Sequence, residues 1–221
     1  MTLTGRFVAR RVFPLLADIE VRGRENIPAG GGFILASNHI GRFDSLMAYH
    51  LLDTSDVIQP FTDKYKNSLV FRFVAWALGM TWIKRGEPDI KTMREIIMRL
   101  KKGGALVIAP EGTRSKTASM IKGESGVIFI AAQSGAQIIP VGVTGTEDAL
   151  VKSRWKSLRR LEIVLNVGKP YTPPSIKVAE RERAIEAATE DLMCRIAALL
   201  PESYRGVYAN HPRTRELLAA N

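Results

Sequence analysis

FILASNHIGRFD (residues 33–44) begins with four apolar residues and continues as a polar segment with one histidine and one aspartate. The apolar run Phe33–Ala36 is typical of a buried strand. His39, after this strand, can act as a general base if the carboxylate of Asp44 accepts from one ring nitrogen and leaves the other free. The alternative is structural: Asp44 caps a helix that starts near Ser45, and His39 bonds a loop carbonyl.

Six apolar runs predict strands, and helical patterns lie between most of them. The strands are expected at Gly32–Ser37, Val57–Phe61, Met80–Lys84, Ala105–Ala109, Ile138–Val143 and Leu161–Val167. Helices are expected at Pro88–Lys102, Lys122–Ser134 and around Ile185–Leu199. This alternation predicts an α/β fold: a single domain with a largely parallel or mixed central sheet flanked by helices. Ligand sites in such sheets gather at the carboxyl ends of strands, where His39 is expected.

The composition restricts the possible partners. The formal net charge of +10 implies an anionic partner: nucleic acid, an anionic membrane surface or a phosphorylated substrate. The single cysteine, Cys194, excludes an intrachain disulfide, and no Cys/His cluster suggests zinc, so we expect no metal or other cofactor. No run reaches the roughly 18–20 apolar residues of a membrane span. No secretory signal is recognisable, and we expect a peripheral (monotopic) protein on the cytoplasmic face of a membrane.

Two basic segments are candidates for membrane contact. Residues 1–20 resemble a short basic amphipathic helix, which either lies in the membrane interface or packs on the domain with its arginines in water. Residues 152–160 carry five cations, no acid and a tryptophan, and either contact an anionic surface or form a solvated loop between strands. The residues expected to contact the membrane are Arg6, Phe7, Arg10, Arg11, Arg154, Trp155 and Lys156.

Three more segments place polar residues at or near the ends of apolar runs: GMTWIKRG (79–86), APEGTRS (109–115) and IIPVGVTG (138–145). In the first, strand alternation puts Lys84 and Arg85 on opposite faces, so one of them can enter a site. The alternative is a strand that leaves the core with solvated charges.

The APEGTRS segment has the chemistry of an anion site. Gly112 permits an unusual backbone angle, and the planar fork of Arg114 suits a phosphate. The alternative is a plain turn. In IIPVGVTG, the proline suggests an edge strand or a bend, and the alternative is a core strand.

The four segments, in this order and spacing, resemble the four blocks of the glycerolipid acyltransferase family, specifically the 1-acylglycerol-3-phosphate acyltransferases. The resemblance runs from about Val21 to Gly168. It implies that His39 and Asp44 are catalytic. It also implies that the acceptor's phosphate is held by Arg85, Glu111, Gly112, Thr113 and Arg114, with Lys64. Ala109 departs from the family, which often has phenylalanine there.

The resemblance implies transfer of a fatty acyl group from a thioester to the free hydroxyl of 1-acylglycerol 3-phosphate, giving phosphatidic acid. The co-substrate is acyl-CoA or acyl carrier protein. Residues 1–20 would contact the membrane and residues 21–221 would form the acyltransferase domain. Two alternatives stay open: the same chemistry on another lysophospholipid or an acylated amine lipid, and a non-catalytic basic protein that binds membranes or nucleic acid. No nucleic-acid motif is present in the sequence, so no nucleic-acid partner is expected.

Overall fold

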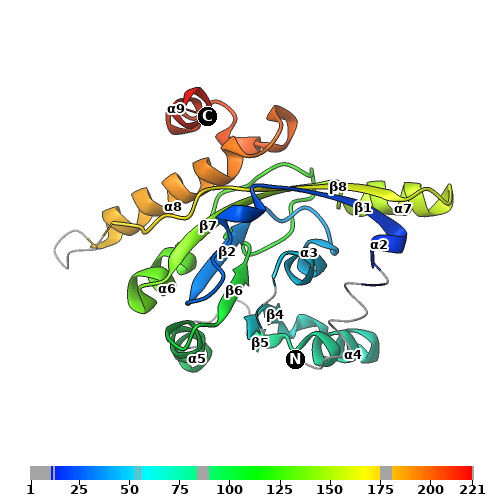
Figure 1. Cartoon of the computed structure of the whole chain (residues 1–221), viewed down its shortest axis with the longest axis horizontal. Helices are drawn as coiled ribbons and strands as arrows, with labels where there is room; N and C mark the ends of the chain where they lie inside the picture. The colour runs from blue at the N-terminus through cyan, green and yellow to red at the C-terminus, as the bar shows by residue number, and fades with distance from the viewer. Residues whose placement is uncertain are drawn as a thin grey trace.

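The computed structural model describes residues 11, 13–52, 54, 56–83, 90–174 and 181–220. In these residues a six-stranded sheet lies between helices on both faces (Figure 1). The strand order is β1-β8-β7-β2-β6-β3, and all neighbours are parallel except β7 and β8. The strands are β1 (Ala17–Arg22), β2 (Phe33–Ser37), β3 (Val57–Ile58), β6 (Ala105–Ile108), β7 (Gln137–Thr144) and β8 (Leu161–Val167). A small second sheet pairs β4 (Pro60–Thr62) with β5 (Thr81–Ile83).

Helices connect most of these strands. They are α2 (Phe13–Leu16), α3 (Asp44–Leu51), α4 (Leu69–Leu78), α5 (Ile90–Lys101), α6 (Gly126–Ser134), α7 (Asp148–Lys156), α8 (Arg181–Ala198) and α9 (Pro212–Ala219). Short 3₁₀ turns lie at η1 (Arg24–Asn26), η2 (Asp63–Tyr65), η4 (Glu202–Tyr204) and η5 (Gly206–Tyr208).

The central strand β2 explains why both faces of the sheet are covered. Phe33 and Leu35 point into one buried cluster, which includes residues of α2, α3 and α4. Ile34 and Ala36 point into another, which includes residues of α5, α6 and α8. Because successive side chains alternate between faces, an unbroken apolar strand requires a helix layer on each side.

The predicted α/β class, with one largely parallel mixed sheet and flanking helices, is confirmed. The strand expected at Val57–Phe61 is wrong in one respect, because β3 pairs in the main sheet and β4 pairs with β5 in the small one. The helix expected from Lys122 begins only at Gly126. Residues 148–156 form α7, so the basic segment 152–160 is helical up to Lys156 and is a turn and loop from there to β8. The proline of IIPVGVTG lies in β7, between β8 and β2, and not at an edge.

The amino-terminal segment is described only in part. Residues 1–10 and 12 lie outside the described residues, so the amphipathic helix expected over residues 1–20 stays a prediction. The described part contains α2 and then β1, a strand that the sequence analysis missed. β1 pairs in parallel with β8, and the expected domain boundary at residue 20 falls inside it.

The parallel pairing of β2 with β6 and β7 positions the candidate site. Parallel neighbours end at the same edge of a sheet. The segments that follow Ser37, Ile108 and Thr144 therefore leave this edge together. These stretches lie in or directly after the first (33–44), third (109–115) and fourth (138–145) segments quoted above.

Candidate active site

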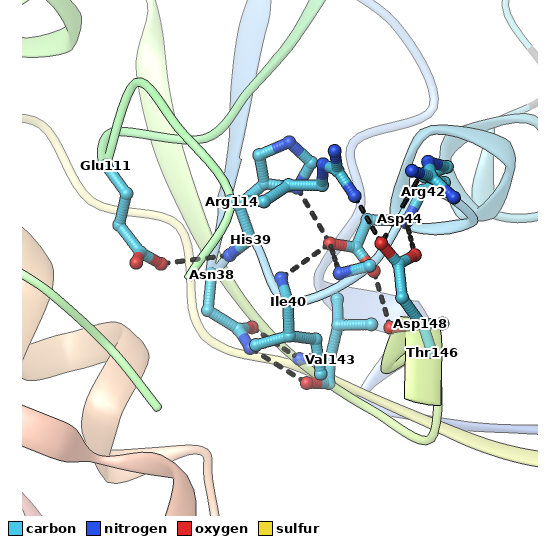
Figure 2. A network of polar contacts seen from close by, with 11 residues as sticks. Asn38, His39, Ile40, Arg42, Asp44, Glu111, Arg114, Val143, Thr146 and Asp148 are labelled. Atoms are coloured by element: carbon cyan, nitrogen blue, oxygen red, sulfur yellow. Dashed lines mark hydrogen bonds and ion pairs between the residues drawn. The ribbon is translucent and has the colours of Figure 1, made fainter. Parts of the chain in front are cut away.

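The structure brings His39 and Asp44 into contact (Figure 2). His39 Nδ1 lies 2.8 Å from Asp44 Oδ2. An ionised carboxylate only accepts hydrogen bonds, so Nδ1 carries the ring proton and Nε2 carries the lone pair. No described residue hydrogen-bonds to Nε2, and a quarter of the His39 side chain (25%) is exposed. The imidazole thus has one nitrogen fixed by a carboxylate and one open for a substrate proton.

The Asp44 carboxylate is held by four donors. Besides the His39 ring, Oδ2 accepts the backbone N–H of Ile40 at 2.8 Å and of Gly41 at 3.0 Å. Oδ1 accepts the hydroxyl of Thr146. Asp44 is the first residue of α3, and Phe43 occupies the N-cap position without a side-chain cap. The capping alternative is therefore wrong, because the carboxylate turns back onto its own loop instead of bonding the first turn of α3.

Two close contacts fasten this loop to the end of β7. The Asn38 side chain donates to the carbonyl of Val143 at 2.9 Å and accepts its N–H at 2.7 Å. A Cβ on Gly41 would lie 1.7 Å from the carbonyl oxygen of Thr146, so only glycine fits there. The segment after β7 is therefore built against the His39 loop, with Thr146 in reach of Asp44.

Glu111 links the third segment to the same loop. Its side chain is 3% exposed. One oxygen accepts the backbone N–H of His39 at 2.9 Å and the other accepts that of Ile121 at 3.1 Å. Burial raises the pKa of this carboxyl, although the two backbone hydrogen bonds oppose the shift. The Ser115 N–H also donates to the His39 carbonyl at 2.8 Å. Both polar groups of the His39 backbone are therefore fixed by the APEGTRS segment.

Arg114 points toward the first and fourth segments and not into solvent. Its guanidinium pairs with the carboxylate of Asp148, the first residue of α7 (Figure 2). The same carboxylate accepts the backbone N–H of Arg42 at 3.1 Å, and the Arg42 Nε lies 3.9 Å from it. Two arginines thus meet one aspartate next to the His39 loop, with the Arg114 side chain 28% exposed.

The remaining predicted residues are placed as follows. Gly112 has φ of 64°, a left-handed value that favours glycine, and Thr113 is partly exposed beside it. Lys64 lies in η2, exposed, and no hydrogen bond or ion pair of the described residues joins it to the His39 loop. Arg85 lies outside the described residues, as do Arg6, Phe7 and Arg10.

The other candidates for membrane contact are described. Arg11 is exposed. On α7, Trp155 is 44% exposed and packs edge-on against Phe43, with ring centroids 5.3 Å apart. Arg154 pairs with Glu162 at 2.8 Å, and Lys156 is exposed at the end of α7.

Sequence reasoning missed Asn38, Arg42, Thr146 and Asp148. Asn38 and Arg42 were within the quoted segment, but nothing in a single sequence distinguishes their roles. Thr146 and Asp148 follow the fourth segment at the carboxyl end of β7, and that position was the available signal.

The described residues contain no group of three or more His, Cys, Asp and Glu side chains that could hold a metal ion. Within the same residues, no helix combines the length and the apolar character needed to cross a bilayer.

The fold and the site define an α/β protein with an oriented histidine suited to taking a proton from a hydroxyl, and with arginines beside it. Residues 18–144 match the sequence profile of the family described as Acyltransferase. This range is more than half of the chain, and the chain belongs to the acyltransferase family.

Curated relatives are similar over different lengths. A 1-acyl-sn-glycerol-3-phosphate acyltransferase of Chlamydomonas reinhardtii is 25% identical over 161 residues, which are 70% of this chain and 47% of the relative. A chloroplastic one of Arabidopsis thaliana is 29% identical, over 58% of this chain and 36% of the relative. The chain thus spans half or less of these two proteins. A Bacillus subtilis protein with the same activity in its name is 24% identical, over 85% of this chain and 91% of its own length.

The fold is also similar to a solved structure. The 1-acyl-sn-glycerophosphate (LPA) acyltransferase PlsC from Thermotoga maritima superposes with a TM-score of 0.61 over 85% of this chain and 78% of that chain. The two sequences are 24% identical. This similarity supports the α/β architecture.

Proposed function

We propose that this chain transfers a fatty acyl group from a thioester to the free hydroxyl of 1-acylglycerol 3-phosphate and so forms phosphatidic acid. The observation that carries the proposal is the open Nε2 of His39, whose other ring nitrogen is held 2.8 Å from Asp44. Membership of the acyltransferase family and the names of the relatives support the reaction class and the acceptor.

In the proposed step, His39 Nε2 takes the proton of the acceptor hydroxyl while the oxygen attacks the thioester carbonyl. The C–S bond then breaks, the ester forms, and the imidazolium returns the proton to the thiolate. Asp44 keeps Nδ1 protonated and stabilises the imidazolium through their hydrogen bond. The acyl group passes directly between the substrates, so no acyl-enzyme intermediate is needed. The donor is acyl-CoA or acyl carrier protein, which serves as co-substrate and not as cofactor.

The acceptor's phosphate would be held by Arg114, with Arg85, Lys64 and the backbone of Gly112 and Thr113. Arg114 supports this role because its fork lies beside the His39 loop and already binds a carboxylate, Asp148. The contacts of Glu111 support a role for this residue other than the expected contact with the phosphate. Both of its oxygens accept backbone N–H groups, so it positions the His39 loop.

The enzyme would work as a peripheral protein on the cytoplasmic face of an anionic membrane. Residues 1–20 would contact the bilayer, together with Arg154, Trp155 and Lys156, and residues 21–221 would form the catalytic domain. The +10 charge supports an anionic surface as partner.

The test is thiol release from acyl-CoA and from acyl carrier protein, with 1-acylglycerol 3-phosphate and a panel of other lysophospholipids as acceptors. Release that requires both the phosphate acceptor and His39, shown with His39→Ala, supports the proposal. A preference for another acceptor would keep the chemistry and change the substrate. Absence of release with every pair of donor and acceptor would contradict catalysis.

A further inference from the structure

Helix α4 (LVFRFVAWAL) is apolar on two opposite faces, and Arg72 is its sole charged residue. One face is buried: Ala75 is 2% exposed, Leu78 is 6% exposed, and the Leu78 carbonyl accepts the hydroxyl of Tyr49 at 2.7 Å. A helix that is apolar all round is normally buried all round. The second face of α4 departs from this rule.

This second face exposes three large side chains on successive turns. Leu69 is 78%, Phe73 65% and Trp76 64% exposed. The rings of Phe73 and Trp76 lie 5.8 Å apart. Beside them is an open hollow of about 650 Å³, whose lining is mostly apolar and includes Arg72, Met80 and Trp82. Grouped exposed apolar side chains of this size mark an interaction surface more often than scattered ones do.

Cations outnumber acids along the chain that forms this face. From residue 63 to residue 83 the chain carries three cations, Lys64, Lys66 and Arg72, and one acid, Asp63. The Lys66 ammonium lies 5.8 Å from the ring centroid of Trp82, a residue that lines the hollow. Apolar and aromatic side chains rimmed by cations are suited to the boundary between acyl chains and anionic headgroups.

A second copy of the chain fits this surface less well than a bilayer does. Joining two such faces would bring together two segments that each carry three cations and one acid, in a chain of net charge +10. Figure 1 also places α4 at the same end of the long axis as α2 and α7. Exposed apolar side chains on and directly after those helices include Leu15 (73%) and Leu158 (96%).

We propose that the α4 face, defined as Leu69, Arg72, Phe73, Trp76 and Trp82, docks on the surface of an anionic bilayer. Leu69, Phe73 and Trp76 enter the boundary between headgroups and acyl chains, while Arg72 binds lipid phosphates. None of these residues belongs to residues 1–20 or to Arg154–Lys156, for which membrane contact was expected from the sequence. Docking needs no chemistry at His39.

Vesicle co-sedimentation of the full chain tests the surface. The vesicles contain phosphatidylcholine alone or mixed with phosphatidylglycerol, and no acyl donor is present. The double variant Phe73→Ser/Trp76→Ser should lose at least about tenfold in affinity for the anionic vesicles. Each substitution removes apolar area that the wild-type protein would bury in the bilayer. The matched control is Met98→Ser/Val207→Ser, at residues that are 57% and 65% exposed elsewhere, and it should bind as wild type does.

Equal binding of wild type and the α4 variant would overturn the proposal. All four substitutions are at exposed positions, and the melting temperature of each variant confirms that it is folded. If the wild-type protein binds vesicles as expected but releases no thiol, only the proposed function is contradicted. The failure of the docking proposal and the failure of the proposed function are therefore distinguishable.

Tryptophan fluorescence gives a second readout, because replacing tryptophan by phenylalanine keeps the α4 face apolar and aromatic. The variant Trp82→Phe/Trp155→Phe leaves Trp76 as the sole tryptophan, and Trp76→Phe/Trp82→Phe leaves Trp155. Quenching of Trp76 by brominated lipid in anionic vesicles is the expected result. Quenching of Trp155 without quenching of Trp76 would overturn the proposal and assign bilayer contact to α7. Concentration-dependent dimerisation without lipid, abolished by Phe73→Ser/Trp76→Ser, would assign the face to a second copy.

Discussion

Two histidines of this chain bond to carboxylates in different ways. His39 bonds Asp44 through Nδ1, and no described residue hydrogen-bonds to its Nε2. His211 bonds Glu190 through Nε2 at 3.1 Å, while its Nδ1 accepts the backbone N–H of Arg213 at 3.1 Å and faces the sulfur of Cys194 at 3.2 Å. His211 is the N-cap of α9.

The difference is in the nitrogen that carries the lone pair. In His39 that nitrogen is Nε2 and it is open, whereas in His211 it is Nδ1 and it is occupied by a backbone donor. A histidine beside a carboxylate is therefore not enough for a general base; the remaining nitrogen has to be available to the substrate. Cys194, next to His211, is also not suited to act as a nucleophile. The residue is fully buried, and burial raises the pKa of its thiol.

The strongest test of the comparison replaces each carboxylate by its amide. Asp44→Asn should lower kcat by about 10²–10⁴-fold, because an amide can hold the ring in the wrong tautomer and no longer stabilises the imidazolium. Glu190→Gln should leave kcat and KM unchanged. Thiol release under saturating substrates measures both variants. Equal losses in the two, or none in Asp44→Asn, would contradict the distinction between the two histidines.

A second test concerns the arginines near the His39 loop. Arg114→Ala should raise KM for the phosphate acceptor by about 10–100-fold, the value of one or two charge-assisted hydrogen bonds. An acceptor without a phosphomonoester should be unaffected. Arg195→Ala is the control, since Arg195 has a similarly exposed side chain (26%) and pairs with Asp191 on α8. A uniform loss for all acceptors would show that Arg114 supports the loop and not the phosphate.

The sequence predicted the parts of this site that depend on position in a strand. His39 and Arg114 follow apolar runs, and parallel strands bring such ends together, so their proximity could be expected. A free ring nitrogen on His39 was also expected, provided that Asp44 accepted from the other one. The donors that hold Asp44 in place could not be foreseen, because they are the hydroxyl of Thr146, far along the chain, and backbone N–H groups of the loop. The role of Glu111 was also beyond reach, since an acid in a phosphate segment gives no sign that it faces the interior.

The fold was predictable to a similar degree. β2 and β6 are continuous apolar runs and were found, while β1 (ADIEVR) was missed because its charges resemble those of a surface segment. Its burial pattern alternates, since it lies at the edge of the sheet beside β8. β5 was expected in the main sheet, but no local property of its sequence determines which strand it pairs with.

The structural histidine should affect stability and not activity. His211→Ala removes the acceptor of the Arg213 N–H at the start of α9 and should lower the free energy of unfolding by about 1 kcal/mol, as for other N-caps. Urea denaturation measures the loss, and the thiol-release assay should give the wild-type kcat. A fall in kcat of the folded variant would mean that His211 has a part in the chemistry.

An effect of similar size that depends on pH is expected next to His211. Asp191 accepts from Arg195 at 2.6 Å and from Arg213 at 2.7 Å, which ties α8 to α9. Burial raises the pKa of this carboxyl, but the two arginine hydrogen bonds outweigh burial and hold the pKa below its ordinary value of 3.8.

A carboxyl with a lowered pKa in the folded state stabilises the fold above its ordinary pKa, and this contribution is lost as the pH falls through the folded value. Asp191→Asn should therefore cost about 1 kcal/mol at neutral pH, as for a partly exposed ion pair. The difference from wild type should shrink as the pH falls below 3.8. The control is Glu186→Gln on the same helix, whose pair with Lys122 is 3.8 Å long and largely exposed, and it should change little at any pH. Urea denaturation of the three proteins at each pH measures these differences. A cost that is constant with pH would mean that packing of the side chain, and not its charge, joins α8 to α9.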